Sequence, residues 1–131
     1  MKYDDLLNAP FKRRGRDKNG FDCYGAVLEC CRRAGTPLID VFSEIEKLPA
    51  ERINDYIKNG LNVRRIDAPK IGAIMQSTYK GNAHVGYIVS RGLVLHATID
   101  SGVKIAPLAA FSNPIFYEVS DDTNSFSNEN H

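Results

Sequence analysis

The sequence predicts an α+β domain in which N-terminal helices pack on one face of an antiparallel sheet. Apolar residues follow a helical spacing in the first half of the chain. After Arg65 the pattern changes to short strand-like runs separated by turns. The 131 residues have the size of one ordinary domain, and 43% hydrophobic residues suffice for a core. We expect one domain over residues 1–120 and a flexible polar tail over residues 121–131.

The first 20 residues predict a short helix or turn followed by a loop, with a strong turn signal at Asn19-Gly20. A helix over residues 23–34 follows. Its apolar residues recur at i, i+3, i+4 and i+7, and Asp22 is well suited to accept the free N–H groups of its first turn. Gly35 and Pro37 then favour an end to this helix.

Two further helices are expected over residues 40–48 and 49–58, the second with Pro49 in its first turn. Strand-like runs then cover residues 71–76, 85–90, 93–98, 103–105 and 115–119. Arg91-Gly92 joins two of these runs closely enough for a tight hairpin.

The composition excludes several classes of protein. A net charge of +1 with sparse aromatic residues gives little support to nucleic-acid binding, and no apolar run is long enough to span a membrane. The start of the chain has no apolar segment of the kind a secretory signal needs, so we expect synthesis in the cytoplasm without a signal peptide. The basic residues of segment 12–18 form either a solvated loop or a cationic rim beside a site.

The three cysteines, Cys23, Cys30 and Cys31, do not form a pattern typical of a disulfide framework or of a zinc site, and we predict no metal. Cys23 falls in the first turn of the predicted helix, where the helix dipole lowers a thiol pKa and favours the reactive thiolate. Cys30 and Cys31 lie about two turns further on, and we interpret them as core residues. A buried, inert Cys23 is the alternative.

A cysteine nucleophile needs a base, and outside the tail the chain offers His84 and His96. Around a hairpin at Arg91-Gly92 the two histidines are offset by about three residues, on the order of 10 Å along a strand. A bulge or a shifted register would be required for contact. Two half-buried structural histidines are the alternative.

Residues 20–27, GFDCYGAV, resemble the nucleophile motif of the NlpC-type cell-wall cysteine peptidases, which are compact papain-like enzymes. His84-Val85-Gly86 resembles the histidine motif of that family, and His96 lies where a third polar residue is found. The similarity covers roughly residues 10–119 and is greatest to the branch carried by tailed phages and prophages.

The resemblance implies a papain-like fold and a catalytic site of Cys23 as nucleophile, His84 as general base and His96 as its orienting partner. Asp22 and Tyr24 would contact substrate, and Asp22 would also cap the helix. No cofactor is implied. Two positions depart from the family: Phe11 stands where many relatives have a tyrosine hydroxyl near the oxyanion, and Tyr24 replaces a serine.

The sequence therefore predicts a cysteine peptidase that hydrolyses an amide bond of peptidoglycan stem peptides, by resemblance the bond between D-glutamate and the diamino acid. We expect it to act at the cell wall as part of a phage tail or prophage-derived particle, with phage tail proteins as partners. Two alternatives remain open: a tail-assembly or interaction subunit of the same fold with little activity, and a thiol acyltransferase or amidase acting on another substrate.

Overall fold

The computed structural model describes residues 2–79 and 81–120, so the expected flexible tail over residues 121–131 lies outside the described residues. The helices are α1 (Cys23–Arg33) and α2 (Ile53–Lys58), and the 3₁₀ turns are η1 (Asp4–Leu6), η2 (Ile45–Lys47), η3 (Ala50–Arg52) and η4 (Leu108–Ala110). The strands are β1 (Arg16–Asp17), β2 (Gly20–Phe21), β3 (Val63–Ile66), β4 (Ile74–Tyr79), β5 (Asn82–Ser90), β6 (Leu93–Thr98), β7 (Gly102–Pro107) and β8 (Ile115–Val119).

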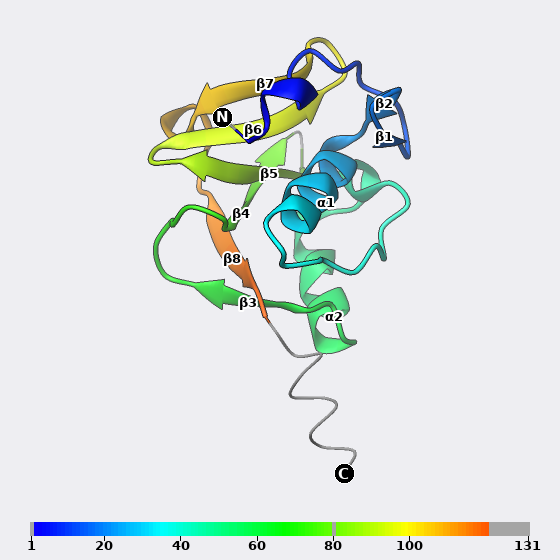
Figure 1. The fold of residues 1–131 in the computed structure, drawn as a ribbon. Helices are drawn as coiled ribbons and strands as arrows, with labels where there is room; N and C mark the ends of the chain where they lie inside the picture. The colour runs from blue at the N-terminus through cyan, green and yellow to red at the C-terminus, as the bar shows by residue number, and fades with distance from the viewer. Residues whose placement is uncertain (1, 80, 121–131) are drawn as a thin grey trace.

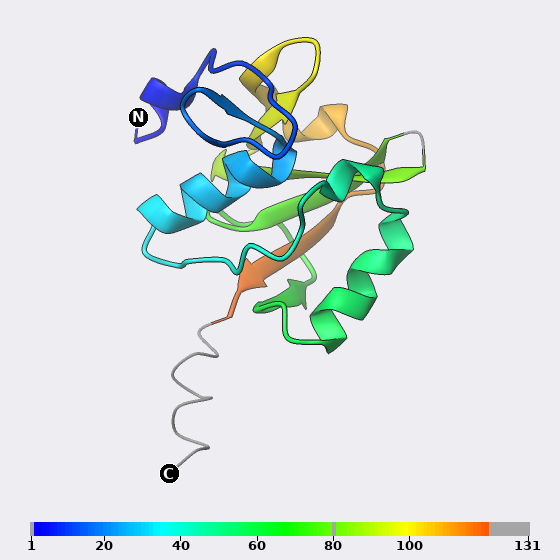
Figure 2. The same ribbon diagram turned by 90° about the vertical axis from the view of Figure 1, so that its right-hand side faces the viewer.

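A six-stranded antiparallel sheet, in the order β3-β8-β4-β5-β6-β7, forms the centre of the fold. Figures 1 and 2 show α1 lying across this sheet beside β5, with α2 near the β3 end. The predicted α+β class is confirmed, with helices packed on an antiparallel sheet. No helix within residues 2–79 and 81–120 is long and apolar enough to cross a membrane.

The sheet buries apolar residues on both faces. The larger cluster includes Cys23 and Val27 of α1 together with Val85 of β5, and the smaller cluster includes Ile88 of β5 and Val94 of β6. Side chains alternate between faces along a strand. His84, at an even position of β5, therefore shares the face of Ile88 and lies opposite to the face on which α1 packs.

Helix α1 and strands β4 to β8 largely confirm the sequence predictions, strands β1 to β3 were not predicted, and the helix expected over residues 40–48 is wrong. That segment contains only the single turn η2, and Val41 is 40% exposed. One carbonyl group within it and one just before it bond to side chains instead of to a helical ladder. Arg16 donates to the Phe42 carbonyl at 2.6 Å, and the Tyr24 hydroxyl donates to the Ile39 carbonyl. Because these bonds satisfy the backbone, the apolar spacing alone does not produce a helix.

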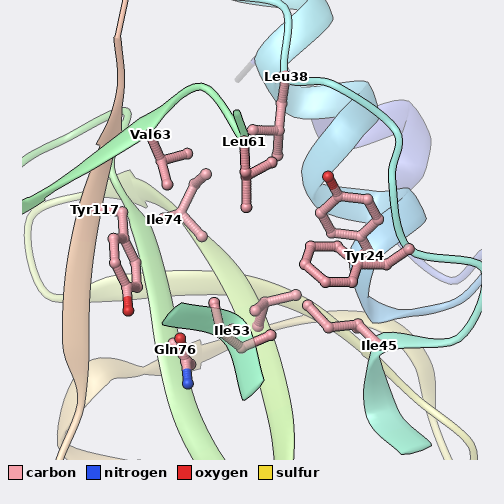
Figure 3. Close-up of a pocket in the computed structure, with 11 residues that line it drawn as sticks. Tyr24, Leu38, Ile45, Ile53, Leu61, Val63, Ile74, Gln76 and Tyr117 are labelled. Carbon is pink, nitrogen blue, oxygen red and sulfur yellow. The ribbon is translucent and has the colours of Figure 1, made fainter. Parts of the chain in front are cut away.

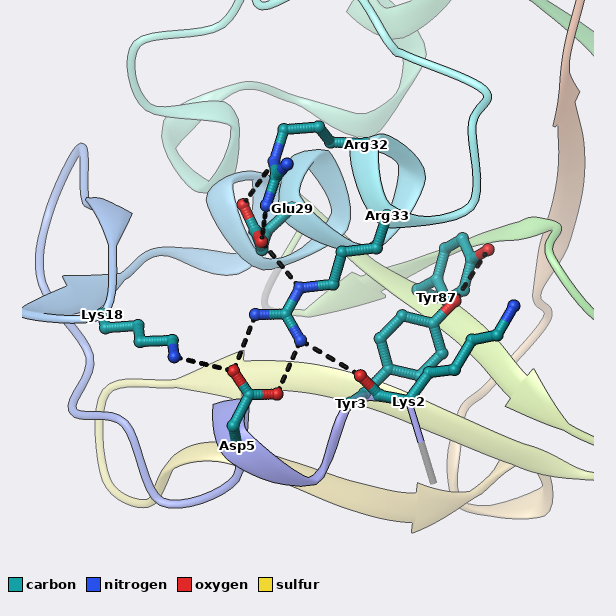
Figure 4. Close-up of polar contacts among 8 residues, drawn as sticks. All are labelled: Lys2, Tyr3, Asp5, Lys18, Glu29, Arg32, Arg33 and Tyr87. Atoms are coloured by element: carbon teal, nitrogen blue, oxygen red, sulfur yellow. Dashed lines mark hydrogen bonds and ion pairs between the residues drawn. The ribbon is translucent and has the colours of Figure 1, made fainter.

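The N-terminal segment is attached to α1 by a network of charged residues (Figure 4). Arg33, in the last turn of α1, makes a bidentate contact with Asp5 at 2.6 and 2.8 Å and a further bond to Glu29. Lys18 also reaches Asp5, at 2.8 Å. These contacts fix residues 2–21 across the helix that carries Cys23, and they account for one of the cations in the basic segment.

Candidate active site

The N-terminus of α1 is built from a buried carboxylate and closely packed glycines. Asp22 is fully buried, and its Oδ1 accepts the Gly25 N–H at 2.6 Å, as an N-cap does. Arg16 donates to the same Oδ1 at 2.7 Å. A Cβ at Gly25 would lie 2.0 Å from the carbonyl oxygen of Gly15, so only glycine allows this approach. The cap therefore fixes the backbone at Cys23.

Cys23 is 1% exposed, and its sulfur lies between two polar groups. The Val85 backbone N–H of β5 bonds to the sulfur, and the thiol donates to Oε2 of Glu46 at 3.7 Å. Burial raises the pKa of the thiol strongly, the Val85 N–H opposes this, and the carboxylates of Glu46 and Asp22 raise the pKa further. The thiol pKa is therefore raised in this conformation, against the lowering expected at a helix N-terminus, because the sulfur is desolvated and two carboxylates lie near it.

The structure brings the two predicted histidines together. The Nε2 atom of His84 and the Nδ1 atom of His96 are 3.0 Å apart, and the rings meet edge to face. Phe111, which follows η4, stacks on His84 at a centroid distance of 6.2 Å and meets His96 edge-on at 5.0 Å. This pair is held in one arrangement, with an aromatic ring covering both members.

Burial and, to a smaller extent, the neighbouring His96 lower the pKa of His84 to about 4. Burial also lowers the pKa of His96. Both rings are therefore neutral at pH 7, and only one of them donates in the bond between them. When His84 donates from Nε2, its Nδ1 carries a lone pair and can accept a proton. That tautomer is the one a general base requires.

Cys23, at the N-terminus of α1, and His84, in β5, make no direct hydrogen bond in the described part of the chain. The ladder from β5 to β6 begins at Tyr87, and on the same side the Ala83 N–H bonds to the Leu48 carbonyl, so among the described residues the edge of β5 lacks a strand partner around Val85. The Cys23 sulfur occupies this edge at Val85, the residue after His84. The Cys23 thiol bonds to Glu46, and the His84 Nε2 bonds to His96. The three predicted catalytic residues thus gather at one end of β5, and their catalytic roles stay predictions.

Tyr24 and Phe11 are packing residues in this conformation. Tyr24 is 3% exposed, its ring meets Phe42 edge-on, and the Arg16 guanidinium lies over it. Its predicted contact with substrate, like that of the fully buried Asp22, stays a prediction. Phe11 bridges Phe21 in the N-terminal segment and packs against the core.

A small apolar cavity lies beside the site (Figure 3). Its volume is about 30 Å³, which is room for little more than a water molecule. Tyr24, Ile45 and Val85 line it, and each is the chain neighbour of a residue at the site. The side chain of Gln76 also lines it, and its Oε1 is buried without a hydrogen-bond partner. The cavity is thus an incompletely filled part of the core, too small for a peptide.

The sequence analysis did not predict three features of the site: Glu46, Phe111 and the individual role of Arg16. Glu46 falls inside the wrongly predicted helix, and Phe111 lies outside every motif. Arg16 belongs to the basic segment, but it pairs with Asp22 and Asp40 and is not a free cation. A single half-buried arginine among exposed ones carries no sequence signal. Among the described residues, no group of three or more His, Cys, Asp or Glu side chains could hold a metal ion.

The fold and the site define a papain-like α+β domain with a cysteine at a helix N-terminus and a histidine pair on the adjoining sheet. Among solved structures, the chain is similar to the NlpC/p60 domain of the peptidoglycan hydrolase SagA. The TM-score is 0.60 at 20% sequence identity, and the match covers 91% of this chain and 92% of that one. No protein-family model matches the sequence, and no curated protein matches it.

Proposed function

We propose that this protein is a cysteine peptidase that hydrolyses an amide bond in peptidoglycan stem peptides. The observation that carries the proposal is the His84–His96 pair, 3.0 Å apart at the end of β5 that adjoins Cys23. The likeness of the fold to the domain of a peptidoglycan hydrolase supports the choice of substrate.

In this proposal, His84 takes the Cys23 proton at Nδ1 while its Nε2–H donates to His96. The thiolate attacks the scissile carbonyl, and His84 returns the proton to the leaving amine. Water then hydrolyses the acyl-enzyme with His84 again as base. His96 is a neutral acceptor, so it orients the ring and stabilises the imidazolium through a dipole rather than through a full charge.

The finer assignments rest on the sequence. We propose the bond between D-glutamate and the diamino acid as the scissile bond, and delivery to the cell wall by a phage tail or prophage-derived particle. Mass spectrometry of the released muropeptides tests the first. Antibody detection of the chain in purified particles tests the second.

The decisive experiment compares digestion of purified peptidoglycan by the wild type, Cys23→Ala and Cys30→Ser. Cys30 is buried in the same helix and serves as the matched control. We expect new muropeptides from the wild type and from Cys30→Ser, and none from Cys23→Ala. Equal loss in both variants, with the fold preserved by circular dichroism, would refute Cys23 as the nucleophile. A new amide linkage in place of hydrolysis would indicate acyl transfer.

One observation favours a second candidate function. The Cys23 thiol is buried and protonated, and Phe11 provides no hydroxyl group. These features suit a tail-assembly or interaction subunit that keeps the fold with little activity. The absence of cleavage by both the wild type and Cys23→Ala would support this candidate.

A further inference from the structure

The Glu46 carboxylate points toward the Cys23 thiol, although basic side chains lie nearby on the surface. Its Oε2 accepts the Cys23 thiol at 3.7 Å, and its Oε1 is buried without a hydrogen-bond partner. Glu44, two residues earlier, instead pairs with Lys47 at 2.6 Å and with Arg14 at 3.4 Å. No ion pair is found for Glu46 within residues 2–79 and 81–120. A half-buried carboxylate with an unfilled acceptor is costly, so this contact calls for an explanation.

We propose that Glu46 is a positioning residue that keeps the Cys23 thiol protonated and engaged away from His84, and that η2 must move before the thiol reacts. The inference takes Cys23 as nucleophile from the proposed function and concerns the regulation of that same site. In this conformation the protein is latent, and a substrate or partner that displaces η2 would release the thiol to His84.

The charges around the sulfur support this role. Loss of the thiol proton would place a thiolate beside the Glu46 carboxylate, with the Asp22 carboxylate also close, and like charges at this range disfavour ionisation. Burial raises the pKa of Glu46, its own backbone N–H and the Cys23 thiol oppose this, and Asp22 and Glu44 raise the pKa further. The Arg16 guanidinium, which bonds to Asp22, is shared between Asp22 and Asp40. The neutral His84 adds no positive charge at pH 7.

The segment that carries Glu46 is attached to the core on both sides of that residue: Ile45 is buried, and the Leu48 carbonyl directly after η2 accepts the Ala83 N–H of β5 at 2.9 Å. η2 is a single 3₁₀ turn, and no side chain caps its N-terminus. Ile45 anchors it in the core, but the same residue lines the cavity of about 30 Å³ and so lacks packing partners on that side. A displacement of the turn that leaves the Leu48–Ala83 bond in place would expose Cys23 while α1 and β5 stay where they are.

Alkylation of the native chain by iodoacetamide tests the proposal without any peptidoglycan. The rate at Cys23 is followed over about pH 7 to 9 by mass spectrometry of the tryptic peptide of residues 19–32. Cys30 and Cys31 lie in the same peptide, are fully buried, and report any general loosening of the fold. The variants are Glu46→Gln, which keeps the cover but removes the charge, Glu46→Ala, which removes both, and Glu51→Gln, at an exposed glutamate outside η2, as the control.

We expect Glu46→Gln to label Cys23 about tenfold faster than the wild type at each pH, equivalent to a thiol pKa lower by about one unit. Glu46→Ala should be at least as fast, Glu51→Gln should match the wild type, and Cys30 and Cys31 should stay unlabelled. An unchanged Cys23 rate in Glu46→Gln would overturn the proposal, as would equal acceleration at all three cysteines. Faster labelling in a protein that never cleaves peptidoglycan would uphold latency while refuting the proposed substrate.

Discussion

His84 and His96 are diagonal partners on one face of the sheet, with Nε2 and Nδ1 3.0 Å apart. A regular hairpin at Arg91-Gly92 would offset them by three residues and place them on opposite faces. The ladder of β5 and β6 instead shifts by one residue between Ile88 and Ser90. This bulge reduces the offset to two residues, a separation that large side chains on one face can bridge.

Gly86 makes room for this diagonal contact, and we expect Gly86→Ala to disrupt it. The ladder from Tyr87 and Leu95 places residue 86 opposite His96. A Cβ there would lie 2.4 Å from Cγ1 of Val94 and 3.3 Å from the His96 Cβ. We expect a loss of about 1–3 kcal/mol in the free energy of unfolding, measured by urea denaturation, with lower peptidase activity because His96 is displaced.

The matched test is the double variant Gly86→Ala, Val94→Ala, which removes the nearest clashing methyl group. Its loss of stability should be smaller than the sum of the two single losses, since each change makes room for the other. Strict additivity would show that the added methyl group does not meet Val94.

Periodic patterns in the sequence predicted the elements that carry the site, because α1 and the strands each bury a regular set of apolar residues. The site itself depends on features that have no period. The bulge in β5 is a backbone irregularity, and the contacts of Phe111 and Glu46 join segments far apart in the chain. The helix wrongly expected over residues 40–48 failed for a related reason, since Arg16 bonds to the Phe42 carbonyl within it and Tyr24 to the Ile39 carbonyl just before it.

The low pKa of His84 predicts a loss of stability in mild acid. The pKa is about 4 in the folded protein against an ordinary value of 6.5, so the unfolded chain binds the proton first. Stability should be complete above pH 6.5 and should fall as the pH drops from about 6.5 to about 4. The loss from this residue is at most about 3 kcal/mol.

Urea denaturation at several pH values measures this loss, and His84→Asn is the control. Because the pKa of His96 is also lowered, the variant should keep a shallower dependence in the same direction. A pH dependence as steep in His84→Asn as in the wild type would contradict the assignment to His84.

Phe111 keeps water from the histidine pair, so Phe111→Ala should raise the pKa of His84 from about 4 toward 6.5. Titration of the histidine ring protons by nuclear magnetic resonance measures the change. Phe111→Leu keeps an apolar cover without the stacked ring and should shift the pKa less. If the pKa of His84 stayed the same in Phe111→Ala, the burial of that ring would have to come from other residues.

Arg16 joins the N-terminal cap of α1 to the loop after α1, so its replacement should lower the free energy of unfolding markedly. The guanidinium bonds to Asp22 at 2.7 Å, to Asp40 at 3.0 Å and to the Phe42 carbonyl at 2.6 Å. Arg16→Ala would leave the fully buried Asp22 carboxylate without its cation, which should cost about 2–4 kcal/mol of unfolding free energy in urea denaturation. Arg14, whose side chain is 71% exposed, is the control, and its alanine variant should cost under about 0.5 kcal/mol. Similar small losses in both variants would mean that the Gly25 N–H alone satisfies the cap.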